Sequence, residues 1–232
     1  MKKILYSVAL AACCMGTMTS CSDFLDASNK SNVTAKQSFA TKEGLNNLVN
    51  NAYQHLQNVY AAPLFTSCFS AGTDMYADAR NKMNEALNTY ETLTPENTDI
   101  KNLYTYLYSG IRAANSVSYY AQTAQVDDKT KGQLVGEARV LAAYEYYLLV
   151  NNFGGVPIMK DFLTTADTGY PKSSAADVYA YIISELEDVI SKNVLQASTA
   201  TKGGGRISQE TAKAILAKTY LSAAWDLNQQ EY

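Results

Sequence analysis

The stretch GEARVLAAYEYYLLVNNFGGVPI, residues 136–158, predicts a long buried helix with a defined end. One face carries apolar or small side chains at three- or four-residue spacing, namely Val135, Ala138, Ala142, Tyr146, Leu149 and Phe153. Further apolar side chains fill the other faces, so the helix needs neighbours on several sides. Gly154 and Gly155 can take the left-handed conformation that closes a helix, and Pro157 prevents the helix from resuming. The stretch is therefore expected to form the core helix of a helical protein.

Other segments carry the same periodicity and are the expected neighbours of this core helix. They cover residues 45–56, 99–124, 179–190 and 212–223. Thr41, Ser174 and Ser208 are expected to cap the starts of three of these helices, and Asp127–Asp128 to begin the core helix. Glu137 and Arg139 are two residues apart and do not face each other, so each is expected to pair with a neighbouring helix. The charged side chains Glu185, Glu187, Asp188 and Lys192 are expected on a solvated face.

The composition argues against several classes of site and partner. The 232 residues carry a net charge of −3 and no basic stretch longer than two residues, so nucleic acid is not an expected partner. His55 is the only histidine and has no cysteine partner nearby, so neither a metal nor another cofactor is expected. Gly203–Gly205 are not followed by the Gly-Lys-Ser/Thr of a phosphate-binding loop. Cys68 is expected to be a small buried hydrophobic residue rather than a reactive thiol.

Residues 1–20 have the features of a bacterial lipoprotein signal peptide. Lys2 and Lys3 precede an apolar stretch that is too short for a convincing membrane span and that ends in small residues. Two cysteines compete as the lipidation site. Leu-Ala-Ala before Cys13 fits the usual lipobox better, but cleavage there leaves only about 9 apolar residues, near the short end for such a segment. Cys21, which follows Met-Thr-Ser, keeps a longer apolar stretch and is the preferred site.

Four stretches of the sequence resemble the SusD/RagB family, the surface glycan-binding lipoproteins of Bacteroidetes. EARVLAAYEYYLLVNNFGGVPI resembles the signature helix of that family, and LYTYLYSGIRAAN resembles the helix that precedes it. GRISQETAKAILAKTYLSAAW resembles the second signature, and CSDFLD resembles the mature start of these lipoproteins. The resemblance implies an all-α, tetratricopeptide-like helical repeat array with irregular loop insertions. The array rests on the resemblance, because the sequence shows no clean repeat of about 34 residues.

The resemblance also implies an organisation and roles for single residues. Residues 1–20 would be the signal peptide, 21–40 the lipidated N-terminus and tether, and 41–232 the helical domain. That domain is expected to be incomplete at its C-terminus, because members of the family are about twice as long. Asn115 matches an asparagine of the family and is expected to lock one helix to another, while Trp225 is expected to pack at a helix turn.

The least regular stretch, Pro63–Pro95, is the expected binding region, because long irregular connections are often functional. Its candidate ligand-binding residues are Asp74, Tyr76, Asp78, Arg80, Asn81 and Tyr90. Aromatic rings can cover the apolar face of a pyranose, while carboxylates, amides and guanidinium groups hydrogen-bond its hydroxyls. The alternative is an ordinary polar loop that tyrosine side chains pin to the body of the protein.

The function that the resemblance implies is capture of oligosaccharides, without catalysis, for import by a partner SusC-like TonB-dependent transporter. The protein would be anchored to the outer membrane through the lipid on Cys21 and exposed at the cell surface. One alternative is a helical scaffold that binds the transporter but no ligand. A less favoured alternative is a surface glycosidase, which needs two carboxyl groups about 5–9.5 Å apart. Asp74 and Asp78 would be the candidates, although no recognisable motif surrounds them.

Overall fold

Helices provide the regular structure of the chain. The structure, a computed structural model, describes residues 34–61, 63–76, 85–165, 169–198 and 205–228. The helices are α3 (Ala35–Ser38), α4 (Lys42–Tyr60), α5 (Leu64–Phe69), α6 (Glu85–Thr89), α7 (Thr98–Ala121), α8 (Asp128–Phe153), α9 (Ala175–Lys192) and α10 (Gln209–Asp226). Within the described ranges there is no β-strand, only an isolated bridge between Thr73 and Tyr76. The prediction of an all-α protein is confirmed.

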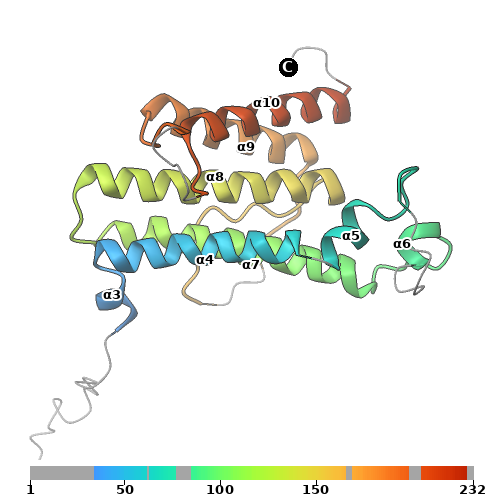
Figure 1. Ribbon diagram of the computed structural model, residues 1–232, viewed down its shortest axis with the longest axis horizontal. Coiled ribbons are helices and arrows are strands. Elements are labelled where there is room, and N and C mark those ends of the chain that lie inside the picture. Colours follow the sequence, from blue (N-terminus) through green and yellow to red (C-terminus); the bar gives the residue numbers. More distant parts are fainter. Residues whose placement is uncertain (1–33, 62, 77–84, 166–168, 199–204, 229–232) are drawn as a thin grey trace, which may run out of the picture. The chain divides into compact units, whose positions relative to one another are not determined.

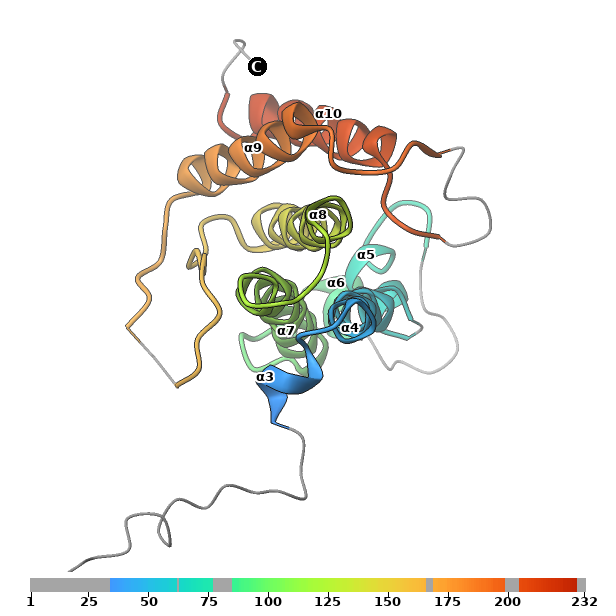
Figure 2. The same cartoon turned by 90° about the vertical axis from the view of Figure 1, so that its left-hand side faces the viewer.

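The core helix α8 lies between two pairs of helices. Figure 2 shows α4 and α7 on one side of it and α9 and α10 on the other. Fully or nearly fully buried apolar side chains occur on all of its faces, among them Ala138, Val140, Leu141, Ala143, Tyr146, Leu149 and Val150. Each long helix packs against the next one in the sequence (Figure 1), as in a tetratricopeptide-like array. The prediction of a core helix with neighbours on several sides is thus confirmed.

The helix ends follow local signals in the sequence. The Oγ1 atom of Thr41 accepts a hydrogen bond from the backbone N of Gly44 at 3.0 Å, and Asp127 caps α8 in the same way. Ser174 forms a capping box with Asp177 at the start of α9. At the end of α8, Gly154 has a φ of +67°, a conformation that side chains disfavour. These caps confirm the predicted helix starts and the predicted end of the core helix.

Ion pairs join α8 to the segments on either side of it. Arg139 reaches α9, where Nε lies 2.7 Å from Oε2 of Glu185 and Nη1 lies 2.5 Å from Oδ2 of Asp188. Glu137, which is fully buried, accepts from Nε of Arg206 at 2.6 Å in the segment before α10. The prediction that Glu137 and Arg139 pair with neighbouring elements is confirmed. The expectation that Glu185 and Asp188 lie on a purely solvated face is wrong, because both carboxylates bind α8.

The segment that follows α8 runs back along α7. The hydroxyl of Tyr108 donates to the carbonyl of Pro157 at 2.7 Å, and Nδ2 of Asn115 donates to the carbonyl of Met159 at 2.8 Å. From α8, the hydroxyl of Tyr146 accepts from the backbone N of Met159 at 2.6 Å. Asn115 therefore fixes an extended segment to α7 rather than one helix to another, which corrects the prediction. The segment positions the side chains that are considered below.

Helix α10 exposes apolar side chains on its outer surface. Trp225 is 86% exposed and Leu221, one turn earlier, is 74% exposed. The expectation that Trp225 packs at a turn is therefore wrong for the described residues. The inward face of α10 carries Ala212, Ile215, Thr219 and Ala223 instead. None of the helices in the described ranges combines the length and hydrophobicity that a bilayer-spanning helix requires.

Candidate functional site

A turn beside α5 and α6 holds three of the predicted ligand-binding residues together. Gly72 and Tyr90 both have positive φ values, +74° and +63°, and the hydroxyl of Tyr90 donates to the carbonyl of Gly72 at 3.4 Å. A Cβ atom at Gly72 would lie 2.2 Å from Oη of Tyr90, so only glycine fits there. Asp74 and Tyr76 follow on the same turn. Tyr90 therefore pins the turn that presents the other two residues.

The side chains of Asp74, Tyr76 and Tyr90 are exposed to solvent and are therefore accessible to a ligand. Tyr76 is 39% exposed and Tyr90 is 56% exposed, and Asp74 is also exposed. Asp78, Arg80 and Asn81 lie outside the described residues, as does Cys21. Tyr90 can both pin the loop and contact a ligand. Its hydroxyl is bonded to Gly72, while about half of its surface is exposed to solvent.

A row of aromatic rings at the junction of α4 and α5 was missed by sequence reasoning. Tyr60, Phe65 and Phe69 lie with ring centroids 5.4–6.4 Å apart, and Tyr60 and Phe65 are partly exposed. The hydroxyl of Tyr60 is hydrogen-bonded to that of Tyr144 on α8, which fixes the position of the ring. The i, i+4 spacing of Phe65 and Phe69 was the available signal. The rings add apolar surface at the same end of the helices as α5 and α6 (Figure 1).

A cavity of about 330 Å³ lies beneath this region, between α5, α6, α7 and the end of α8. Its wall includes Ser67, Cys68, Leu87, Tyr90, Asn151, Asn152 and Phe153. Burial raises the pKa of the Cys68 thiol to about 11, and the nearby Asp99 acts in the same direction. The thiol therefore stays protonated near neutral pH and is a poor nucleophile, as expected. The cavity offers amide and hydroxyl groups beside an aromatic ring.

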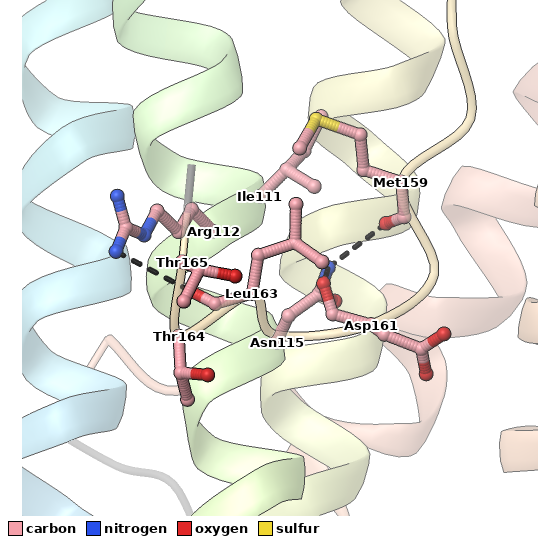
Figure 3. A pocket seen from close by; sticks show the side chains of 8 residues that line it. All are labelled: Ile111, Arg112, Asn115, Met159, Asp161, Leu163, Thr164 and Thr165. Atoms are coloured by element: carbon pink, nitrogen blue, oxygen red, sulfur yellow. Dashed lines mark hydrogen bonds between the residues drawn. The ribbon is translucent and has the colours of Figure 1, made fainter. Parts of the chain in front are cut away.

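A second set of cavities lies along α7, where the segment after α8 crosses it. Figure 3 shows the smallest of them, about 230 Å³, with Arg112 at one end and Asp161 at the other. Nη2 of Arg112 donates to the carbonyl of Leu163 at 3.5 Å, and Asn115 holds the carbonyl of Met159. No pattern in the sequence indicated this site, because its two walls come from segments about 45 residues apart along the chain.

The described residues offer no recognisable catalytic or metal centre. They contain no group of three or more His, Cys, Asp or Glu side chains placed to hold a metal ion. His55 is half-buried on α4, and burial lowers the pKa of its imidazole, so it is neutral near pH 7. The separation of the carboxyl groups of Asp74 and Asp78, the candidates for glycoside hydrolysis, is not defined because Asp78 lies outside the described residues.

Three comparisons place the chain among known proteins. The family model described as "SusD-like_3: Starch-binding associating with outer membrane" matches residues 23–221. A relative in Formosa agariphila, "SusD-like protein P38", is 28% identical over 190 residues, which are 80% of this chain and 36% of that protein. The chain thus spans about a third of the length of this curated relative.

Solved structures show the same arrangement of helices. Surface glycan-binding protein A from Bacteroides uniformis is 26% identical, with a TM-score of 0.66 over 77% of this chain and 41% of that one. Surface glycan-binding protein A from Bacteroides thetaiotaomicron, in complex with laminarihexaose, has a TM-score of 0.64 at 21% identity. That match covers 80% of this chain and 40% of the other, and at this identity it supports the fold alone.

Proposed function

This chain belongs to the SusD/RagB family, and from that premise we propose that it is a cell-surface lipoprotein that binds glycans. It captures oligosaccharides for import by a partner SusC-like TonB-dependent transporter and catalyses no reaction on them. The observation that carries the proposal is the exposure of Asp74, Tyr76 and Tyr90 on the turn beside α5 and α6. The name of the similar Bacteroides uniformis protein, a surface glycan-binding protein, supports the same ligand class.

The chemistry of the turn suits a sugar. The proposed ligand-binding residues are Asp74, Tyr76, Asp78, Arg80, Asn81 and Tyr90. The rings of Tyr76 and Tyr90 offer flat apolar surfaces to the C–H face of a pyranose, and Asp74 can accept hydrogen bonds from its hydroxyls. Because Tyr90 holds the backbone of Gly72, the turn is ordered before the ligand arrives, which lowers the entropy lost on binding.

Replacement of Tyr76 by alanine is expected to weaken glycan binding about tenfold, which corresponds to about 1.4 kcal/mol. The measurement is isothermal titration calorimetry of the purified chain against a glycan panel that contains starch oligosaccharides and laminarihexaose. Tyr119→Ala is the matched control, because Tyr119 is 43% exposed, close to the 39% of Tyr76, and lies at the far end of α7. If the Tyr76 and Tyr119 variants bind the glycan with equal affinity, the turn is not part of the binding site.

The lipid anchor is proposed at Cys21. A Cys21→Ala variant is expected to lose labelling by palmitate and to leave the membrane fraction, because acyl chains contribute roughly 0.8 kcal/mol per buried methylene. A Cys13→Ala variant serves as the control and is expected to keep both label and membrane attachment. Loss of labelling in the Cys13 variant alone would move the anchor to Cys13.

The runner-up function is a helical scaffold that binds the transporter but no ligand. The observation in its favour is the apolar outer surface of α10, where Leu221 and Trp225 are exposed. Purification of the chain from membranes distinguishes the two functions. A transporter that co-purifies with a chain lacking affinity for every glycan in the panel would favour the scaffold. Release of shorter sugars from the panel would instead support the glycosidase.

A further inference from the structure

Arg112 differs from the other two arginines in the described part of the chain because it forms no ion pair there. Arg139 and Arg206 both form short ion pairs with carboxylates of the protein. Arg112, on α7, forms none among the described residues, and the residue is exposed. A guanidinium carries five N–H donors and stays charged at all physiological pH values. Within the described residues, most donors of Arg112 and its positive charge are therefore not taken up by other groups of the protein.

Three cavities meet at Arg112. The cavity of Figure 3 has a volume of about 230 Å³, and cavities of about 450 Å³ and 330 Å³ adjoin it along α7. We call the first two together the Arg112 groove, lined by Tyr104, Tyr108, Arg112, Asn115, Met159 and Tyr170 among others. The combined volume of these two cavities lies within the range of about 300–1,000 Å³ that is typical of small-molecule sites.

The groove combines fixed aromatic rings with Arg112, a cation that has no carboxylate partner among the described residues. The rings of Tyr104 and Tyr108 lie 4.7 Å apart, and the hydroxyl of Tyr108 is bonded to the carbonyl of Pro157. Among the described residues, the guanidinium contacts the carbonyl of Leu163 and, at 5.5 Å, the ring of Phe162, and neither of these groups neutralises its charge. Both components are therefore in place before a ligand binds, and this reduces the conformational entropy lost on binding.

The charges around the groove favour an anion at Arg112. Asp161 belongs to the lining, but Figure 3 shows its carboxylate directed away from Arg112. Burial raises the pKa of Tyr181 on α9, and the charges of Glu185 and Asp161 act in the same direction. Near Arg112 the lining includes the hydroxyls of Thr164 and Thr165. These groups can add hydrogen bonds to an oxyanion without opposing its charge.

We propose that the Arg112 groove binds a sugar residue that carries an anionic group, either a carboxylate or a sulfate ester. The anionic group pairs with the guanidinium of Arg112, and the pyranose lies against the tyrosines of the groove. The inference rests on the proposed glycan-binding function and narrows its ligand class to acidic oligosaccharides. The groove is separate from the turn at Tyr76, although Tyr104 of the groove contacts Phe153, which lines the cavity under that turn.

Calorimetric titration of the purified chain with three probes tests the proposal: an oligogalacturonate, a sulfated galactan oligosaccharide and neutral laminarihexaose. Arg112→Met is expected to lower the affinity for one or both acidic probes by about 10- to 100-fold, because it removes charge-assisted hydrogen bonds. Its affinity for laminarihexaose is expected to stay within about twofold. The acidic probe that loses affinity identifies the anionic group.

Lys218→Met is the matched control, because it also removes one exposed positive charge, from α10. It is expected to leave all three affinities unchanged. Arg112→Lys is expected to give an intermediate affinity for the acidic probe, since lysine keeps the charge but not the planar fork of donors. The affinity of the unchanged protein for that probe is also expected to fall with added salt.

The outcomes separate this inference from the proposed function. If Arg112→Met leaves acidic binding unchanged while Tyr76→Ala weakens binding of a neutral glycan, the inference is wrong and the proposed function stands. Equal losses for acidic and neutral probes would also overturn the inference, because they would show no preference for the anionic group. If no member of the full panel binds the unchanged protein, both are overturned.

Discussion

Replacement of Glu145 by methionine is expected to raise the free energy of unfolding at pH 8 by about 1–3 kcal/mol. Glu145 lies in α8, is fully buried, and neither carboxyl oxygen has a hydrogen-bond partner in the described part of the chain. Gly110 of α7 makes room for it, because a Cβ atom there would lie 1.7 Å from Oε1. Methionine has a similar length and removes the buried polar atoms, so the native state becomes more favourable.

The pH dependence of stability gives the sharper test. Burial raises the pKa of Glu145 well above its ordinary value, so the folded state holds this proton more tightly than the unfolded state does. The contribution of Glu145 to the free energy of unfolding is therefore most favourable below its unfolded pKa of about 4.3. It becomes less favourable as the pH rises toward the folded pKa of Glu145. Urea unfolding of the unchanged protein and of Glu145→Met between pH 5 and 9 measures the difference. The variant is expected to lose less stability over that range.

Glu145→Gln is the control that separates titration from polarity. It is expected to flatten the pH dependence as methionine does, but to give a smaller gain in stability at pH 8, because the amide stays buried without partners. Unfolding curves for Glu145→Met that shift with pH as steeply as those of the unchanged protein would show that the carboxyl is not the titrating group.

Replacement of Arg206 by methionine is expected to destabilise the protein by about 3 kcal/mol. It would leave Glu137 fully buried without its cation, although Tyr53 and Gln133 still donate to the carboxylate at 3.2 and 3.0 Å. Those two neutral bonds compensate only part of the lost charge pairing. Arg206 also donates to Oδ1 of Asn50 at 2.9 Å, so the variant separates the segment before α10 from α4 as well.

Chemical denaturation with a double variant tests the cause of this loss. Adding Glu137→Gln to Arg206→Met removes the buried charge and is expected to recover at least half of the lost stability. Lys192→Met provides the comparison with an exposed ion pair, that of Lys192 with Asp188, and is expected to change stability by less than about 1 kcal/mol. If Arg206→Met and Lys192→Met have equal effects, the burial of Glu137 does not set the strength of its pair.

Much of the helical framework could be predicted from the sequence, because the signals that begin and end helices are local. The N-cap bond of Thr41 joins atoms three residues apart, and Gly154 ends α8 through its own backbone conformation. The apolar residues of α8 share faces because of the 3.6-residue period, whatever the rest of the chain does. The grouping of Asp74, Tyr76 and Tyr90 was likewise accessible, since a single short stretch carries them.

The interactions between distant segments were not accessible in this way. Tyr53 donates to Glu137, 84 residues away, and accepts from the backbone of Ile207, 154 residues away. The aromatic row of Tyr60, Phe65 and Phe69 depends on how α5 turns back on α4, and the Arg112 groove depends on the path of the segment after α8. Such contacts depend on how the helices approach one another, which the helical period does not specify.

The sequence by itself determined the all-α class, the order of the long helices, most of their starts and the identity of the core helix, because each follows from local capping and periodicity. Only the tertiary structure decided which charges are neutralised. Glu137 and Arg139 pair with neighbouring segments. Among the described residues, Glu145 is buried without a partner, and Arg112 lies beside a groove without a carboxylate partner. The physical reason is that burial and pairing are properties of the packed neighbours, and the same side chain has a different charge balance in each environment.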